Sequence, residues 1–255
     1  MKKIFLIISL LINMSVFADS VKNIKNVYKA GVLAYREDDY KEAAKLFKEA
    51  CDNNYGLGCL KLGSLYESGN GVAKNKVKSI KFYKKSCTSN ENYSGCYTLN
   101  KKALTKEESR KFFTNLCNDN IGIGCFYLAK SLKGKEMAEL YLKACDNGYP
   151  KGCVVLAKKK KQNKIKLLNK ACDKNYFPAC RFLGKFYTSK NCKLSIEYLM
   201  KGCNNNDALS CFALSGMYAG YSHNNCVDKD IVKAREFCKK SGQLNNDYSC
   251  NSDLE

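Results

Sequence analysis

The stretch from Tyr40 to Tyr66 reads YKEAAKLFKEACDNNYGLGCLKLGSLY and contains the unit from which the rest of the chain is built. Its first half places apolar residues three and four positions apart, which is the spacing of an amphipathic helix and not of a strand. Asp52-Asn53-Asn54 lies between Cys51 and Cys59, directly after Cys51. Such residues favour a left-handed helix end followed by a tight turn. The stretch therefore predicts a helix, a turn and a second helix.

The same unit recurs along the chain, and a pair of cysteines marks each copy. The spacing within a pair is eight residues in five copies, nine in one and twelve in the last: Cys51/Cys59, Cys117/Cys125, Cys145/Cys153, Cys172/Cys180, Cys203/Cys211, Cys87/Cys96 and Cys238/Cys250. A leucine stands three residues after the second cysteine in six copies: Leu62, Leu99, Leu128, Leu156, Leu183 and Leu214. Successive copies start 27 to 36 residues apart, a period typical of stacked helical hairpins. We therefore predict an all-α, α/α solenoid.

The cysteines are predicted to form one disulfide in each repeat, between the end of the first helix and the start of the second. A bridge across nine residues stabilises by roughly 2–3 kcal/mol in the chain-entropy model. Cys192 and Cys226 are left over, each before a first helix, and we predict that they pair because equivalent helix starts lie at one edge of a solenoid. All 16 cysteines would then be oxidised, with no Cys-x-x-Cys spacing for zinc or thiol chemistry. We expect no metal and no cofactor.

The first 18 residues have the features of a cleaved secretory signal peptide. Two lysines precede the 14-residue apolar run from Ile4 to Phe17, and Val16-Phe17-Ala18 provides a small-x-small cleavage site. That run is shorter than the roughly 20 residues that a membrane-spanning helix needs. We therefore predict a periplasmic or secreted mature chain that begins at Asp19 and has no membrane span.

Residues 19–255 are predicted to form a single solenoid of about six to seven repeats. A leading helix at 21–37 would cap its N-terminal end, and the atypical last unit, 229–255, would cap the other end. Thr105-x-x-Glu108 is a capping box and predicts the start of a helix. We expect the chain to be a monomer.

The charge of the chain is strongly positive, with 44 Lys+Arg against 24 Asp+Glu, and loss of the leader lowers the net charge from +20 to +18. Only four of these cations are arginine, the residue suited to bidentate phosphate and base contacts, and the lysines are spread over every repeat. We therefore predict no nucleic-acid partner. The charge favours anionic partners such as a host surface or an anionic polymer. Lys158–Lys161 is the densest basic run, which we interpret first as a solvated linker between repeats.

Three short motifs resemble the Sel1-like repeat family, which is related to the tetratricopeptide repeat: Tyr66-x-x-Gly69-x-Gly71-Val72, Leu62-Gly63-x-x-Tyr66 and Leu183-Gly184-x-x-Tyr187. A cysteine pair in every repeat behind a signal peptide resembles the Helicobacter cysteine-rich proteins over about residues 21–250. The resemblance implies a right-handed superhelix with one disulfide per hairpin. It also implies a secreted, host-interacting protein described as a β-lactamase or penicillin-binding protein. The chain departs from the family in short loops at 103–106, 133–134 and 158–163 and in the extra pair Cys192/Cys226.

The sequence itself contains no standard hydrolase motif. Ser-x-x-Lys and Lys-Thr-Gly are absent, and Ser222-His223-Asn224 matches only the short pattern Ser-x-Asn, which we interpret as an ordinary loop. His223 is the only histidine, which excludes a zinc site built from several imidazoles. No catalytic residue is assigned.

Two classes of function remain. The first is a binding scaffold whose concave groove holds a peptide, a protein or a cell-wall fragment, with those of the 29 tyrosines and phenylalanines that do not pack facing the groove. The second is the β-lactamase implied by resemblance, which we expect to be slower than the roughly 1–1000 s⁻¹ of dedicated enzymes.

Overall fold

The structure is a computed structural model that describes residues 23–89, 93–159, 163–221 and 227–245. Within these ranges the regular elements are all helices, and no strand occurs among them. The predicted signal peptide, Cys226, Cys250 and the Ser222-His223-Asn224 stretch lie outside the described residues. The predicted all-α class is confirmed.

The chain divides into two compact units, Met1–Phe112 and Phe113–Glu255, with the division inside one helix. The prediction of a single solenoid over 19–255 stays a prediction beside this division. In the first unit a helix over residues 23–36 precedes α2 (Tyr40–Asp52), α3 (Gly56–Ser68), α4 (Lys76–Thr88), α5 (Ser94–Thr98), the short π-helix η1 (Leu99–Ala103) and the start of α6 (Lys106–Asn118).

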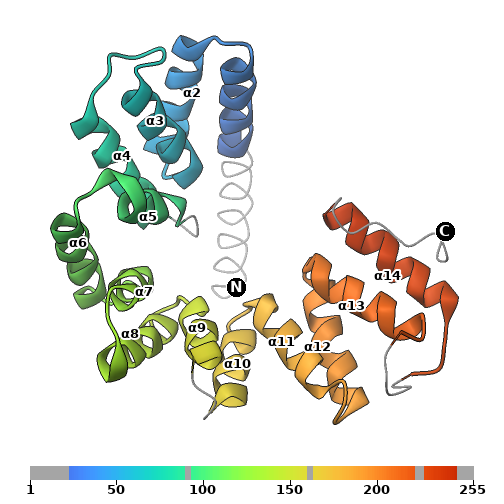
Figure 1. Cartoon of the computed structure of the whole chain (residues 1–255). Coiled ribbons are helices and arrows are strands. Elements are labelled where there is room, and N and C mark those ends of the chain that lie inside the picture. The colour runs from blue at the N-terminus through green and yellow to red at the C-terminus, as the bar shows by residue number, and fades with distance from the viewer. Residues whose placement is uncertain (1–22, 90–92, 160–162, 222–226, 246–255) are drawn as a thin grey trace, which may run out of the picture. The chain divides into compact units, whose positions relative to one another are not determined.

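The second unit continues with four helical hairpins and a last helix. After the end of α6 come α7 (Gly122–Lys130), α8 (Gly134–Asp146), α9 (Lys151–Lys159), α10 (Lys164–Asp173), α11 (Phe177–Tyr187), α12 (Cys192–Asn204), α13 (Ala208–Tyr218) and α14 (Ile231–Leu244). From α7 to α14 each helix packs against the next along the chain (Figure 1). No described helix is both long and apolar enough to cross a bilayer.

Side chains at the N-termini of several first helices satisfy backbone N–H groups that have no partner inside the helix. Asn75 accepts from the Lys78 N–H at 2.9 Å, and Asn191 accepts from the Leu194 N–H at 3.0 Å. The capping box is confirmed: the Glu108 N–H donates to the Thr105 hydroxyl at 3.2 Å, and the Thr105 N–H donates to the Glu108 carboxylate at 2.9 Å.

The turn between the two helices of a hairpin contains one residue in the left-handed region, as the sequence predicts. It is the third residue after the first cysteine, with φ between 58° and 81° in five hairpins: Asn54, Asn120, Gly148, Asn175 and Asn206. The N–H that follows donates back to the residue just before the first cysteine, for example from Tyr55 to the Ala50 carbonyl at 2.9 Å. This is the hydrogen bond of a Schellman motif, which ends the first helix and reverses the chain.

The two helices of each hairpin approach closely because a small residue stands just before the second cysteine. A Cβ placed on Gly58 would lie 2.7 Å from the Ala50 Cβ and 3.0 Å from the Cys51 nitrogen. A Cβ on Gly152 would lie 2.4 Å from the Tyr141 carbonyl oxygen. Gly95 and Gly124 occupy the equivalent place. Glycine at this position lets the disulfide form between helix backbones in near contact.

Six disulfides join the described pairs, so the prediction of one disulfide per repeat is confirmed for these repeats: Cys51–Cys59, Cys87–Cys96, Cys117–Cys125, Cys145–Cys153, Cys172–Cys180 and Cys203–Cys211. Their Cα atoms are 4.5 to 5.3 Å apart, within the usual range for a disulfide. Cys192 and Cys238 are also disulfide-bonded, and no described cysteine is free. Their pairing with Cys226 and Cys250 stays a prediction.

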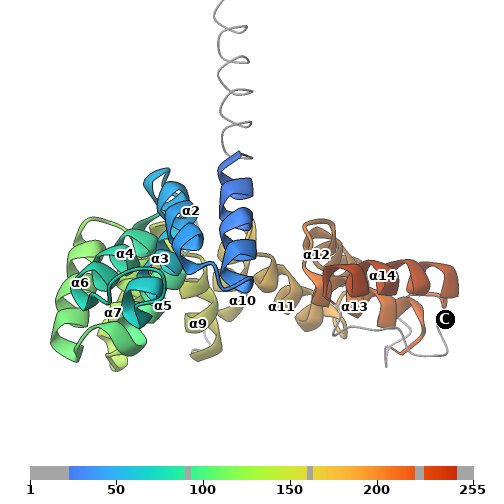
Figure 2. The same ribbon diagram turned by 90° about the horizontal axis from the view of Figure 1, so that it is seen from above.

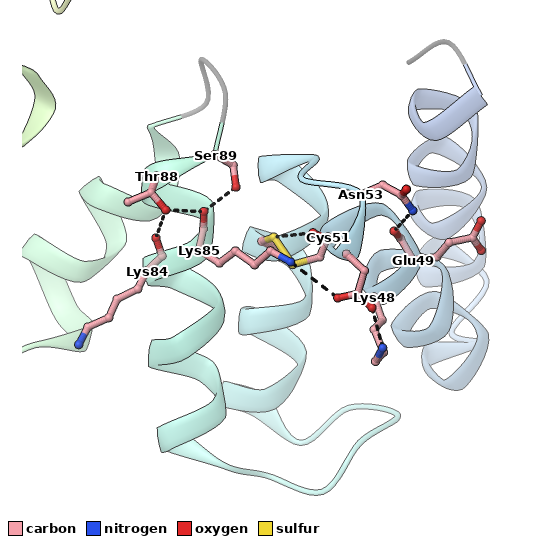
Figure 3. Close-up of a disulfide and its surroundings, with 10 residues drawn as sticks. Lys48, Glu49, Cys51, Asn53, Lys84, Lys85, Thr88 and Ser89 are labelled. Atoms are coloured by element: carbon pink, nitrogen blue, oxygen red, sulfur yellow. Dashed lines mark hydrogen bonds and ion pairs between the residues drawn. A yellow bond between two sulfur atoms is a disulfide. The ribbon is translucent and has the colours of Figure 1, made fainter. Parts of the chain in front are cut away.

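Figure 3 shows the first disulfide and its surroundings. Asp52, just after Cys51, accepts from Lys48 at 2.6 Å within α2 and lies 3.7 Å from Lys85 of α4. The Asn53 side-chain amide donates to the Glu49 carbonyl at 2.9 Å and so covers the end of α2. The turn beside the disulfide is therefore also connected to the next repeat.

The core of the first unit lies between the first three helices. Ala43, Phe47 and Leu62 are buried there, and Tyr28 from the helix over residues 23–36 packs on Phe47 with ring centroids 5.8 Å apart. That helix runs beside α2 in both views (Figure 1, Figure 2). In the second unit, Leu199, Leu214 and Met217 of α12 and α13 form a comparable core.

Candidate functional site

The second helices of the second unit share one face, which we call the second-helix face. It is made of the first and the fifth residue after the second cysteine, which lie four positions apart and so on the same side of a helix. The members are Phe126, Val154, Arg181 and Phe212 at the first position and Lys130, Lys158, Lys185 and Gly216 at the fifth. The lysines of this set are exposed. The face thus presents ammonium groups from three successive repeats.

Aromatic rings lie beneath several of these ammonium groups. Lys158 Nζ of α9 is 4.7 Å from the ring centroid of Phe182 in α11, a contact that links two repeats. Lys130 Nζ is 5.3 Å from the ring centroid of Tyr127. Contacts of this kind hold a cation over the face of a ring without neutralising it. These contacts therefore hold the Lys130 and Lys158 ammonium groups in defined positions.

The basic character is greatest around α9 and α10. From Lys151 to Cys172 the sequence has eight lysines and no acidic residue. The densest run begins here: Lys158 and Lys159 are exposed at the end of α9, while Lys160 and Lys161 lie outside the described residues. This part of the unit therefore has the strongest positive charge of the second-helix face.

A buried ion pair fixes the second-helix face between α11 and the turn before α13. Arg181 Nη1 and the Asp207 carboxylate are 3.7 Å apart, and their side chains are only 13% and 14% exposed. Asp207 also accepts from the Ser210 hydroxyl, whereas Arg181 Nη1 has no hydrogen-bond partner. Burial raises the pKa of the neighbouring Tyr176. The pair positions α11 relative to α13.

A cavity of about 310 Å³ opens at the C-terminal end of the second-helix face. Its lining is mostly apolar and comes from α11, α13, α14 and Tyr221: Lys185, Leu209, Phe212, Ala213, Ser215, Gly216, Tyr221 and Cys238. Phe212 is 44% exposed and Tyr221 is 56% exposed. The volume is at the small end of the range for ligand pockets.

The first unit has a different, charged cavity of about 190 Å³. Glu67 lines it and accepts from Lys102 Nζ at 2.8 Å and from the Tyr83 hydroxyl at 2.7 Å. Burial alone would raise the pKa of Glu67, but these two hydrogen bonds outweigh burial and hold that pKa below its usual value. Because the Glu67 carboxylate already has Lys102 and Tyr83 as partners, we interpret this cavity as part of a contact between repeats.

The described residues show no activated nucleophile or general base. The shifted pKa values all move further from pH 7. The pKa is lowered for carboxyl groups such as Asp52 and Glu108 and raised for tyrosines and lysines. The Ser210 hydroxyl donates to a carboxylate but is completely buried. No cluster of three metal-binding side chains occurs among the residues described.

Sequence reasoning predicted the disulfide pattern but missed the residues that shape the second-helix face. The recurrence of lysine at the fifth position and the Gly-Cys dipeptide in four repeats were readable signals. The Arg181–Asp207 pair gave no such signal, because it joins residues 26 positions apart in different repeats.

The chain is similar to curated proteins of Helicobacter pylori over short segments. It is 36% identical over 77 residues to "Putative beta-lactamase HcpD" and 36% identical over 58 residues to "Beta-lactamase HcpA". These segments cover 30% and 23% of this chain. The chain spans about a quarter of the length of these relatives, 25% and 23%.

Two solved structures share the fold. A Sel1 repeat protein from Oxalobacter formigenes matches with a TM-score of 0.51 and 18% identity, over 86% of this chain and 100% of the other. The immunity protein PA5088 from Pseudomonas aeruginosa matches with a TM-score of 0.50 and 16% identity, over 87% and 84%.

The Sel1 repeat model matches five segments of the chain: 28–55, 56–91, 138–149, 179–207 and 208–246. Each segment longer than 12 residues contains helices of the disulfide-linked hairpins described above or the last helix. The matched residues make up more than half of the sequence, and the chain therefore belongs to the Sel1 repeat family.

Proposed function

We propose that this protein is an exported binding scaffold whose second-helix face holds an acidic, extended polypeptide segment. The observation that carries this proposal is the row of exposed lysines from α7 to α11, Lys130, Lys158 and Lys185, of which the first two lie over aromatic rings. Repeat proteins of stacked helices use such continuous faces to bind extended partners. Charge complementarity would align the segment and accelerate its association.

Export is supported by two independent features. The leader at residues 1–18 has the composition of a signal peptide, and six described disulfides suit an oxidising compartment. The test is the intact mass of the protein recovered from the periplasm and from the medium. In either fraction, the intact mass expected for a chain that begins at Asp19 would support export. A full-length chain found in the cytoplasm would contradict it.

Binding is tested with the oxidised chain 19–255 and a fluorescein-labelled peptide of alternating glutamate and alanine. Reversing Lys130, Lys158 and Lys185 together to glutamate is expected to weaken binding at least about tenfold at low salt. The matched control reverses three exposed lysines of first helices, Lys164, Lys166 and Lys193. Equal loss in both variants would mean unspecific attraction to a basic protein, and no binding by the wild type would end the proposal.

A second candidate is binding and slow hydrolysis of β-lactams. The names of the two Helicobacter pylori relatives, which match over segments of 77 and 58 residues, favour it. The test combines turnover of a chromogenic cephalosporin with intact mass after exposure to penicillin. Turnover that is lost in Ser222→Ala or His223→Ala would assign the Ser222-His223-Asn224 sequence a catalytic role, and turnover unchanged in both would exclude that role.

A further inference from the structure

Gly216 makes the last second helix different from its neighbours. The fifth position after the second cysteine is lysine in α7, α9 and α11, at Lys130, Lys158 and Lys185, but glycine in α13. A Cβ placed on Gly216 would meet no atom within 4 Å, so the space above it is open. The cavity of about 310 Å³ occupies that space. The loss of one side chain from the row is what opens the pocket.

The lining of this pocket determines what it can hold. Leu209, Phe212 and Ala213 supply apolar surface, and Tyr221 lies at the edge. Lys185 is the charged residue of the lining, and no acidic side chain belongs to it. Burying an apolar side chain there is favourable, and a carboxylate beside that side chain would be attracted to the Lys185 ammonium group.

The size of the cavity restricts its occupant further. At about 310 Å³ it accommodates one large side chain with its backbone and is too small for a folded element. The pocket also lies on the same face as the row of lysines, and α11 and α13 are in contact. A polypeptide that follows the lysines reaches the pocket at the end of the row.

We propose that this pocket is a specificity site for a single aromatic side chain flanked by carboxylates in a bound polypeptide. The proposal rests on the proposed function, because it takes the second-helix face as the place where the polypeptide lies. The lysines would supply attraction that depends on charge alone, and the pocket would select the sequence. A polypeptide with acidic residues but no aromatic residue would bind more weakly.

Two fluorescein-labelled peptides test the pocket with the oxidised chain 19–255. One has a single phenylalanine between glutamate pairs, and the other has alanine in place of phenylalanine. Wild-type protein is expected to bind the phenylalanine peptide about tenfold or more tightly than the alanine peptide, because one aromatic side chain is buried. Gly216→Leu is expected to remove this preference, so that this variant binds the two peptides with similar affinity.

The variant is a fair test because it fills open space rather than disturbing packing. The matched control is Ser64→Leu, which places the same side chain at the equivalent, exposed position of α3 in the first unit. This control is expected to keep the preference for phenylalanine. Thermal unfolding of both variants verifies that they remain folded.

Each other outcome has one meaning. If wild-type protein and Tyr248→Ala both bind the two peptides equally, or if Gly216→Leu keeps the preference, the pocket is not a specificity site although the second-helix face still binds. If wild-type protein shows no preference but Tyr248→Ala does, the chain's own Asp247-Tyr248 sequence occupies the pocket, and the proposal of an external ligand is overturned. If no variant binds either peptide, the proposed function and the pocket fail together.

Discussion

The hairpins α2–α3 and α12–α13 use the same disulfide span but place the smallest residue on opposite helices. In α2–α3 the glycine is Gly58 of the second helix, and it faces Ala50. In α12–α13 it is Gly202 of the first helix, and a Cβ there would lie 2.3 Å from the Ser210 hydroxyl oxygen. The Cα atoms of the two disulfides are nevertheless 4.5 Å and 4.7 Å apart. Close approach of the two helices therefore requires a small residue at one of two facing positions, and either helix can supply it.

The contacts between successive hairpins show a second difference. Between α3 and α4, Gly63 packs on the Tyr83 ring, and the Tyr83 hydroxyl donates to Glu67. Between α11 and α12, Gly184 packs on the Leu199 side chain. There the residues equivalent to Glu67 and Ser79 are Thr188 and Ser195, whose hydroxyl oxygens are 3.1 Å apart. One contact depends on a charge and the other on neutral hydroxyl groups.

Reduction of all disulfides is expected to have the largest effect, because it removes the feature that both hairpins share. Each bridge contributes roughly 2–3 kcal/mol in the chain-entropy model, so the six together are comparable to the whole free energy of unfolding of a typical protein, roughly 5–15 kcal/mol. The reduced and alkylated chain should lose most of its helical circular dichroism. A reduced chain that kept its signal and melting temperature would show that glycine packing alone holds the hairpins.

Gly58→Ala is expected to destabilise the first unit by about 1–3 kcal/mol, because the added methyl group meets the backbone of α2. Adding Ala50→Gly reproduces the arrangement of α12–α13 and should recover part of that loss. Urea unfolding of both single variants and the double variant measures the coupling. If the changes in unfolding free energy of the two single variants simply add in the double variant, residues 50 and 58 do not constrain each other.

Gly216→Ala is expected to stabilise the protein, in contrast to the destabilising Gly58→Ala. The new methyl group meets no atom, and replacing glycine in a helix interior stabilises by roughly 0.5–1 kcal/mol. Thermal unfolding of this variant beside Gly58→Ala compares the same substitution in two second helices. A loss of stability at Gly216 would show that the space above α13 is filled.

The smallest expected effect is a pH dependence confined to the contact between α3 and α4. The pKa of Glu67 is below its usual value in the folded chain, so its contribution is present above the unfolded pKa and is lost as the pH falls through the folded value. The contribution should be below about 1 kcal/mol, since both side chains of the Glu67–Lys102 pair are substantially exposed. Glu67→Gln should reduce the change in melting temperature between neutral and acidic pH. Thr188→Val should leave this pH dependence as it is in the wild type.

Local features were predictable because nearby residues determine them. The capping box at Thr105 and the left-handed Asn54 depend on fewer than six neighbouring residues, and both could be predicted from the sequence. The disulfide spacing was equally readable, because the repeat supplies several copies of the same signal.

Features that depend on the facing helix could not be predicted in the same way. Nothing in the sequence shows that Gly202 compensates for Ser210, or that the space above Gly216 is open, until α12, α13 and α14 are packed together. The sequence predicted only a concave groove without named residues and did not single out the second-helix face. Its lysines follow from the repeat once the helix direction is known.

The short span of the described disulfides has a consequence for how the chain acquires them. Sixteen cysteines can pair in about two million ways, but each of the six described bridges joins a cysteine to the next one along the chain, eight or nine residues later. A polypeptide that emerges N-terminus first would oxidise one hairpin at a time, before a wrong partner becomes available. For these bridges a simple thiol oxidase would suffice, without a disulfide isomerase to correct mispaired intermediates.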